Sequence, residues 1–203
     1  MARPRPAETK IGSKTSSKTS PRSGPLDAAA WVAVALDVLA TEGIDAVRVE
    51  PLAKALRVTK GSFYWHFTDR RALIDAMLAH WAQGRIVAIR EQAPADSDPA
   101  LSLRRLADLY TKRGNARGLA IELAIRALAH NDEAAARAVR IVDAERLQLV
   151  AALFERLGWP AREASARAMT VYAFLFGQSL LDPKSVSAAD TSLALDALLA
   201  PPT

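Results

Sequence analysis

From Asp27 onward, apolar side chains recur every three or four residues, which is the spacing of one face of an α-helix. Glycine, proline and Asn-Asp positions interrupt the pattern where helices typically end. No segment alternates apolar and polar residues long enough to predict a strand. We therefore expect an all-α protein of about nine helices, near residues 27–41, 49–56, 59–65, 69–91, 99–113, 115–130, 132–157, 161–181 and 190–199.

The first 25 residues differ from the rest of the chain in composition. They carry six basic residues against one acidic residue, Glu8, and therefore the entire net charge of +5. Ile11 is their only sizeable aliphatic residue beyond Met1, so they cannot bury enough apolar surface to offset the entropy of ordering. We expect residues 1–25 to be a disordered basic tail, which either serves solubility or lies along DNA phosphates.

Composition also narrows the chemistry. The chain has no cysteine, which excludes disulfides and zinc–thiolate sites. His66, His80 and His130 have no second histidine at metal-ligand spacing, and no nucleophile-elbow, phosphate-loop or dinucleotide-binding motif is present. We expect no enzyme activity, no metal and no cofactor. An apolar run at 168–181 is too short to span a membrane, and no signal peptide is apparent, so a cytoplasmic protein is expected.

The segment 59–67, "TKGSFYWHF", holds four of the 12 aromatic residues of the chain in its last five positions. On a helix, Phe63 and Phe67 share one face, which we expect to pack on the core, while Lys60 and Tyr64 point away from it. Thr59 is placed to cap this helix, and Gly61 would allow close backbone approach to another molecule. The alternative is that all four aromatic residues belong to the core.

This segment belongs to a predicted helix-turn-helix. The helices expected at 49–56 and 59–65 are separated by about three residues, the dimensions of that motif. Between positions 48 and 71 six basic residues oppose two acidic ones. A locally basic helix-turn-helix favours a DNA partner.

The stretch "GIDAVRVEPLAKALRVTKGSFYWHFTDRRALI" resembles the DNA-binding domain of the tetracycline-repressor (TetR) family. Leu52-Ala53, 58–61 and 64–67 carry the similarity, followed by Arg70-Arg71 and by Leu73. The resemblance covers about residues 27–85. It implies a three-helix helix-turn-helix domain at 26–85 and a helical effector-binding and dimerisation domain at 86–203.

The resemblance further implies a ligand-responsive transcriptional regulator, expected to be a repressor that a small-molecule effector releases from its operator. Its partners would be a palindromic double-stranded DNA operator, the effector and a second copy of the chain. The expected DNA contacts are Arg48, Val49, Val58, Thr59, Lys60, Gly61, Ser62, Tyr64, Trp65, His66 and Arg70. The alternative is a helical small-molecule-binding or interaction protein that does not regulate transcription.

Two positions depart from the family pattern. The turn holds Arg57 where glycine is usual, and arginine is strained if the backbone there has positive φ. Arg48 stands where a small hydroxyl residue often caps the second helix, so that cap is in question. The fourth helix, expected to begin after Thr68 as its N-cap, would belong to both domains.

Candidate effector and dimer residues come from helix faces. In "GLAIELAIRALAHN" the residues Glu122, Arg126 and His130 lie four apart, which predicts an ion pair on a solvated edge or, alternatively, polar groups in an apolar cavity. The candidate cavity residues are Trp81, Tyr110, Glu122, Arg126 and Phe154. The helix at 166–181 is apolar around most of its circumference, which predicts a two-fold four-helix bundle with the last helix or, alternatively, a central helix in a monomer. The candidate dimer residues are Tyr172, Phe176, Gly177, Leu180, Leu195, Leu198 and Leu199.

Overall fold

The computed structural model describes residues 27–111, 116–182 and 184–202, and the basic tail predicted at 1–25 lies outside them. Over these ranges the chain forms nine α-helices and one short 3-10 turn, η1, with no strand, so the all-α prediction is confirmed. The elements are α1 Ala28–Glu42, η1 Ile44–Ala46, α2 Val49–Leu56, α3 Lys60–Tyr64, α4 Arg70–Gln92, α5 Pro99–Thr111, α6 Ala116–Leu128, α7 Glu133–Arg156, α8 Ala161–Ser179 and α9 Ala188–Leu199.

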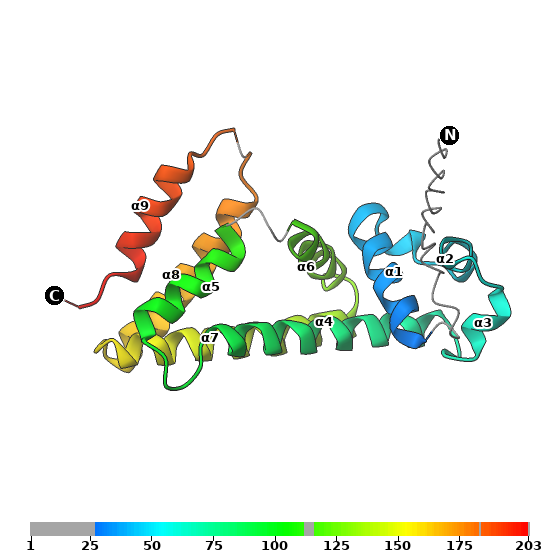
Figure 1. Cartoon of the computed structure of the whole chain (residues 1–203), viewed down its shortest axis with the longest axis horizontal. Helices are drawn as coiled ribbons and strands as arrows, with labels where there is room; N and C mark the ends of the chain where they lie inside the picture. The colour runs from blue at the N-terminus through cyan, green and yellow to red at the C-terminus, as the bar shows by residue number, and fades with distance from the viewer. Residues whose placement is uncertain (1–26, 112–115, 183, 203) are drawn as a thin grey trace, which may run out of the picture.

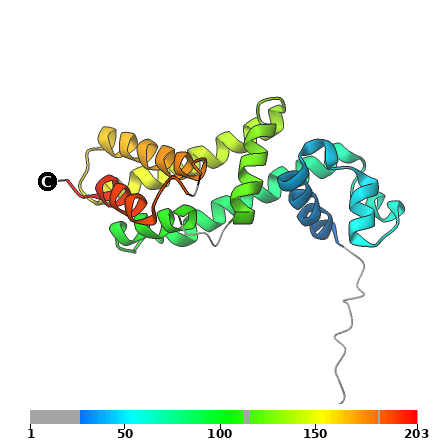
Figure 2. The same ribbon diagram turned by 90° about the horizontal axis from the view of Figure 1, so that it is seen from above.

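The longest helices set the shape of the molecule. α4 and α7, of 23 and 24 residues, run side by side along its length. Helices α1 to α3 gather at one end of α4, and α5, α8 and α9 pack at the other end (Figure 1). α6 crosses between the two groups, as the view from above also shows (Figure 2). The predicted role of α4 as a helix common to both parts is confirmed.

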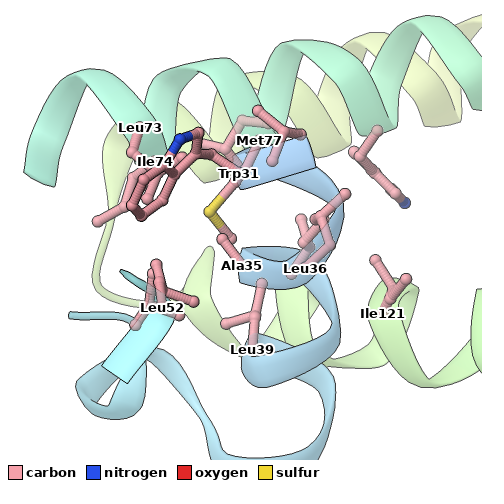
Figure 3. Packing of buried hydrophobic residues seen from close by; sticks show 14 of the residues in the cluster. Trp31, Ala35, Leu36, Leu39, Leu52, Leu73, Ile74, Met77 and Ile121 are labelled. Carbon is pink, nitrogen blue, oxygen red and sulfur yellow. The ribbon is translucent and has the colours of Figure 1, made fainter. Parts of the chain in front are cut away.

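The first hydrophobic core lies beneath the helix-turn-helix but extends beyond it. Trp31 of α1 is completely buried and meets Phe63 of α3 edge-on, with ring centroids 5.3 Å apart. Figure 3 shows side chains of α1, α2 and α4 converging in this core together with Ile121 of α6. Ile125 and Val142 complete it from α6 and α7. The boundary predicted at residue 85 is therefore not a break in packing, because one core joins the first helices to α6 and α7.

The second core joins α5, α7, α8 and α9 with the end of α4. Phe154 of α7 is fully buried there. Leu195 and Leu199 of α9 are also buried in it, although the sequence placed them on the dimer surface. The correction has a simple cause: α9 needs its own apolar stripe to attach to α5 and α8, so the opposite face of α9 is the one left exposed.

Helix ends differ in detail from the predictions. The side chain of Asp69, rather than that of Thr68, accepts a hydrogen bond from the Ala72 N–H at 2.8 Å and caps α4. Thr59 occupies the N-cap position of α3 but its side chain makes no capping bond. No helix of the described residues is long and apolar enough to cross a membrane.

Candidate DNA interface and effector cavity

The turn between α2 and α3 is closed around a left-handed residue. Arg57 has φ 58° and ψ 40°, the conformation that glycine adopts without strain. The N–H of Val58 donates to the Ala53 carbonyl at 3.0 Å, and the Arg57 N–H to the Lys54 carbonyl at 3.1 Å, which satisfies the end of α2. The strain foreseen for Arg57 is confirmed. Its guanidinium is exposed and forms no hydrogen bond or ion pair within the described part of the chain.

The aromatic cluster of α3 divides into two faces. Phe63 and Phe67 are buried, at 0% and 8% exposure, whereas Tyr64 is 54% exposed and Trp65 is 88% exposed. His66 beside them is also exposed. The alternative in which all four aromatic residues are core is therefore excluded. Tryptophan and tyrosine are enriched at binding interfaces, so these two neighbouring exposed side chains suit a binding face.

The basic residues near this face are not all free. Lys60 forms an ion pair with Glu50 of α2, and the hydrogen bond that its ammonium donates to this carboxylate raises the Lys60 pKa. Arg70 donates from Nε to the Val47 carbonyl at 2.6 Å and from Nη2 to the Ile44 carbonyl, which fastens α4 to the segment before α2. Arg70, predicted as a DNA contact, is thus committed to a structural role.

Five further predicted DNA contacts differ in burial and in the bonds that they make. Val49 and Val58 are half-buried against the first core, so their side chains support the motif from within. Arg48 is the N-cap residue of α2 without a capping bond, as its sequence position suggested, and its Nε donates to the Asp45 carbonyl at 2.7 Å. Gly61 is exposed, and a Cβ there would meet only the Thr59 hydroxyl, at 3.6 Å. Ser62 of the same helix is half-buried.

At the other end of the molecule, a cavity opens between α4, α5, α7 and α8. It offers about 70 Å³ to the centres of water-sized molecules, several times what one water needs. Apolar side chains form most of its wall, and its polar residues are Arg85, Tyr110, Arg146 and Tyr172. A larger hollow of about 770 Å³ adjoins it, sharing Arg85 and Tyr110 and reaching Glu122 of α6.

A buried ion-pair network borders the cavity. Glu122 and Arg146 are 1% and 2% exposed, and the two guanidinium Nη groups bind the two carboxylate oxygens, Nη2 to Oε2 at 2.9 Å. Arg126 binds Asp143 with both Nη groups, at 2.5 and 3.0 Å, and reaches Glu122 at 3.1 Å. The Tyr172 hydroxyl donates to Asp143 at 2.6 Å. The predicted ion pair between Glu122 and Arg126 is present, but Glu122 is buried and Arg126 half-buried, so the interpretation of a solvated edge is wrong.

The network keeps its members charged. Burial acts to raise the pKa of Glu122, but the hydrogen bond and charge of Arg146, with the charges of Arg126 and Arg85, outweigh it and lower that pKa. Burial likewise acts to raise the pKa of Asp143, but the hydrogen bonds that Arg126 and Tyr172 donate to it, with the charge of Arg126, lower that pKa. Both carboxylates are thus held ionised beside guanidiniums, Glu122 and Arg146 in the interior and Asp143 and Arg126 at its edge.

The remaining effector candidates lie elsewhere. Trp81 is 3% exposed in the first core and Phe154 is fully buried in the second, and neither lines the cavity. Size suggested both residues, but large aromatic side chains more often fill a core. Sequence reasoning missed Arg85 and Arg146. The available signal was Arg146 itself, a charged residue in helical register with Val142 and Val150 on a buried stripe of α7.

The predicted dimer residues differ in how deeply they are buried. Tyr172 points into the ion-pair network, and Phe176 packs on Tyr110, with ring centroids 5.5 Å apart. Leu198 is half-buried against the second core. Gly177 and Leu180, by contrast, are exposed on α8 and just beyond it. Other large apolar side chains exposed in this region are Met169, Leu181 and Leu193, at 61%, 53% and 71%.

These features define a helical protein with a helix-turn-helix at one end and a cavity at the other. The family model for bacterial regulatory proteins of the tetR family matches residues 32–77. The resemblance is thus confirmed for this domain, which is of the tetR family's DNA-binding type.

Curated relatives match the same region. The chain is 38% identical over 52 residues to the class G tetracycline repressor protein of Vibrio anguillarum, covering 26% of this chain and 25% of the relative. It is 41% identical over 46 residues to the class A tetracycline repressor protein from transposon 1721 of Escherichia coli, covering 23% and 21%. The matched part thus spans about a quarter or less of these relatives.

The rest of the chain is compared through its fold. A transcriptional regulator from Rhodococcus sp. Rha1 superposes with a TM-score of 0.71 at 21% identity, covering 86% of this chain and 94% of that structure. At this identity the likeness establishes the architecture of α4 to α9.

Proposed function

We propose that this protein is a ligand-responsive, sequence-specific DNA-binding transcriptional regulator, a repressor that leaves its operator when a small molecule binds. The observation that carries the proposal is the surface of α3. Tyr64 at the C-terminal end of this helix, and Trp65 and His66 just beyond it, are exposed, as is Lys60 at its start, while Phe63 anchors the helix in the core. A rigid helix that presents aromatic and hydrogen-bonding groups in a basic region suits entry into a DNA groove.

The contacts divide by chemistry. Tyr64 and His66 bring hydrogen-bond donors suited to phosphate oxygens, which orient the protein without reading sequence. Lys60 joins them when its ammonium exchanges Glu50 for a phosphate. Ser62 and Trp65 are the candidates for contact with base edges. Arg57 adds an exposed cation at the turn.

The functional unit is a homodimer in this proposal. We propose that the exposed apolar residues on and beside α8 and α9 together make its interface, called the α8–α9 face: Met169, Gly177, Leu180, Leu181, Leu193 and Ala197. Pairing this face with a second copy buries it in a four-helix bundle. Two recognition helices would then enter successive major grooves about 34 Å apart, which matches a palindromic operator.

Coupling between cavity and DNA runs through α6 as well as α4. Glu122 of α6 faces the ion-pair network, and Ile121 and Ile125 of the same helix lie in the first core. Outside the core, Arg117 binds Asp37 of α1 at 2.6 Å. A ligand that moves α6 therefore moves α1. The expected coupling is about 1–3 kcal/mol, and it acts equally on ligand and DNA affinity.

The test is selection of bound sequences from a random DNA duplex library, followed by a salt titration on the selected site. Wild-type protein should enrich one palindromic sequence. Lys60→Ala should weaken binding to all sequences and lower the salt slope by about one unit. Lys184→Ala, which removes an exposed lysine between α8 and α9, is the control and should leave both unchanged. If no sequence is enriched, the regulator is excluded and a helical binding protein remains.

A further inference from the structure

We propose that the cavity between α4, α5, α7 and α8 binds an apolar molecule carrying one anionic group, such as a carboxylate, and that Arg85 and Tyr110 hold that group. This inference rests on the proposed effector site and adds the chemical class of its ligand. It starts from the charges around the cavity. Two arginines, Arg85 and Arg146, line the wall, and no acidic residue is among the lining residues.

The two arginines are not equivalent. Arg146 has both Nη groups bound to Glu122 and is therefore neutralised. Arg126 is likewise matched by Asp143. Arg85 donates from Nη2 to the Gly118 carbonyl at 3.1 Å, and its Nε is 3.8 Å from a Glu122 oxygen that Arg146 already holds. Three guanidiniums thus share two carboxylates in this network, which leaves one positive charge at Arg85.

A second group beside Arg85 lacks a partner. The Tyr110 hydroxyl forms no hydrogen bond with any other residue that the structure describes. Burial raises the Tyr110 pKa to about 12, so the hydroxyl remains a neutral donor at physiological pH. A partly buried cation and an unpaired donor that line the same cavity are both satisfied by the two oxygens of a carboxylate.

The remaining wall determines the rest of the ligand. Most of the other lining residues are aliphatic, among them Ile89, Leu103, Leu106, Val150 and Leu175. A hydrocarbon or aromatic body gains burial there, while a sugar or a second charge would be left without partners. A cationic ligand finds no carboxylate in the wall and meets Arg85. The site therefore favours a monoanion with an apolar body.

The test uses three probes with the same eight-carbon chain: octanoate, octanol and octylammonium. Binding to the full chain is measured by calorimetry. We expect octanoate to bind at least about tenfold more tightly than octanol, the ratio that ~1.4 kcal/mol produces, and octylammonium to bind most weakly. Equal or tighter binding of octanol or octylammonium would overturn the inference. So would the failure of octanoate to bind at millimolar concentration.

Variants assign the preference to the named residues. Arg85→Gln should reduce the octanoate-to-octanol ratio to about one while octanol affinity stays within about twofold, and Arg85→Lys should retain part of the ratio. Tyr110→Phe should weaken octanoate severalfold without lowering thermal stability, because its hydroxyl has no partner to lose. Arg90→Gln removes an exposed arginine of the same helix that pairs with Glu145, and it should change nothing. An unchanged ratio in a folded Arg85→Gln would refute the assignment.

Failure of this inference can be separated from failure of the proposed function. A chain that selects an operator but ignores octanoate refutes the ligand class alone. A chain that prefers octanoate through Arg85 but binds no DNA sequence refutes the regulator and leaves the ligand class standing.

Discussion

Replacing Glu122 by glutamine should expose the energetic role of the buried network. Glu122 and Arg146 are almost fully buried and joined by two parallel hydrogen bonds. Glutamine keeps the shape and one acceptor oxygen but removes the charge that compensates Arg146. Removing one partner of a buried ion pair typically costs about 3–5 kcal/mol, because the other charge stays in a poorly solvated site. Since glutamine still accepts one hydrogen bond, we expect a loss at the lower end, about 3 kcal/mol.

Thermal and urea unfolding at matched protein concentration measure this loss. For a chain of this size about 3 kcal/mol corresponds to a Tm decrease of about 6–12 °C. The matched control is Glu133→Gln on the exposed first turn of α7, where Glu133 pairs with Arg140 at 2.8 Å. An exposed pair is worth less than about 1 kcal/mol, so its Tm should hardly change.

A second substitution tests the reason for the loss. Adding Arg146→Met to Glu122→Gln removes the stranded charge, and stability should recover by more than half, since apolar residues often replace buried ion pairs without loss. A decrease below about 1 kcal/mol in Glu122→Gln would show that the Arg146 charge is solvated or compensated by another group. Glu122 would then not be the residue that stabilises it.

The same pair predicts a pH dependence. The pKa of Glu122 lies below its ordinary value of 4.5 in the folded chain, so the folded state binds this proton less readily than the unfolded state. The stabilisation is present above about pH 4.5 and is lost as pH falls through the lowered pKa. Urea unfolding between pH 6 and 3 should show a steeper loss for wild type than for Glu122→Gln. Parallel curves would contradict the assignment.

Three further changes test the turn, the dimer and the coupling. Arg57→Gly should stabilise the chain by ~1 kcal/mol in urea unfolding, because glycine adopts the left-handed backbone without strain. A lower stability would contradict the strain. The same change should lower the salt slope of DNA binding by about one if Arg57 contacts a phosphate. Leu193→Glu on the α8–α9 face should give monomers at micromolar concentration in sedimentation, whereas Leu101→Glu on α5, at a side chain 48% exposed, should not. Arg71→Ala breaks the ion pair with Asp132 that connects the start of α4 to the start of α7. DNA affinity should stay within about threefold, while the ligand should release less of the bound DNA. Unchanged release of DNA would exclude this ion pair from the coupling.

Much of the helix-turn-helix end could be predicted from the sequence, because its signals are local. Helical periodicity predicted where the helices lie, and the spacing of Phe63 and Phe67 predicted which face of α3 packs on the core. The residue type at the turn raised the question of positive φ, and the backbone of Arg57 answers it. Each inference involves residues within a few positions of one another, where helix geometry fixes which side chains share a face.

Only the tertiary structure decided which partners the polar side chains meet. Glu122 and Arg126 looked like a surface pair along one helix, but Arg146 and Asp143 of α7 enclose them. Arg70 looked free for DNA, yet backbone carbonyls before α2 hold it.

The faces of the last helices were decided in the same way. Leu195 and Leu199 could have faced a partner or the chain itself, and the packing of α9 on α5 and α8 buries them. Helical spacing shows which residues share a stripe, whereas the element that covers the stripe depends on how helices distant in sequence pack together.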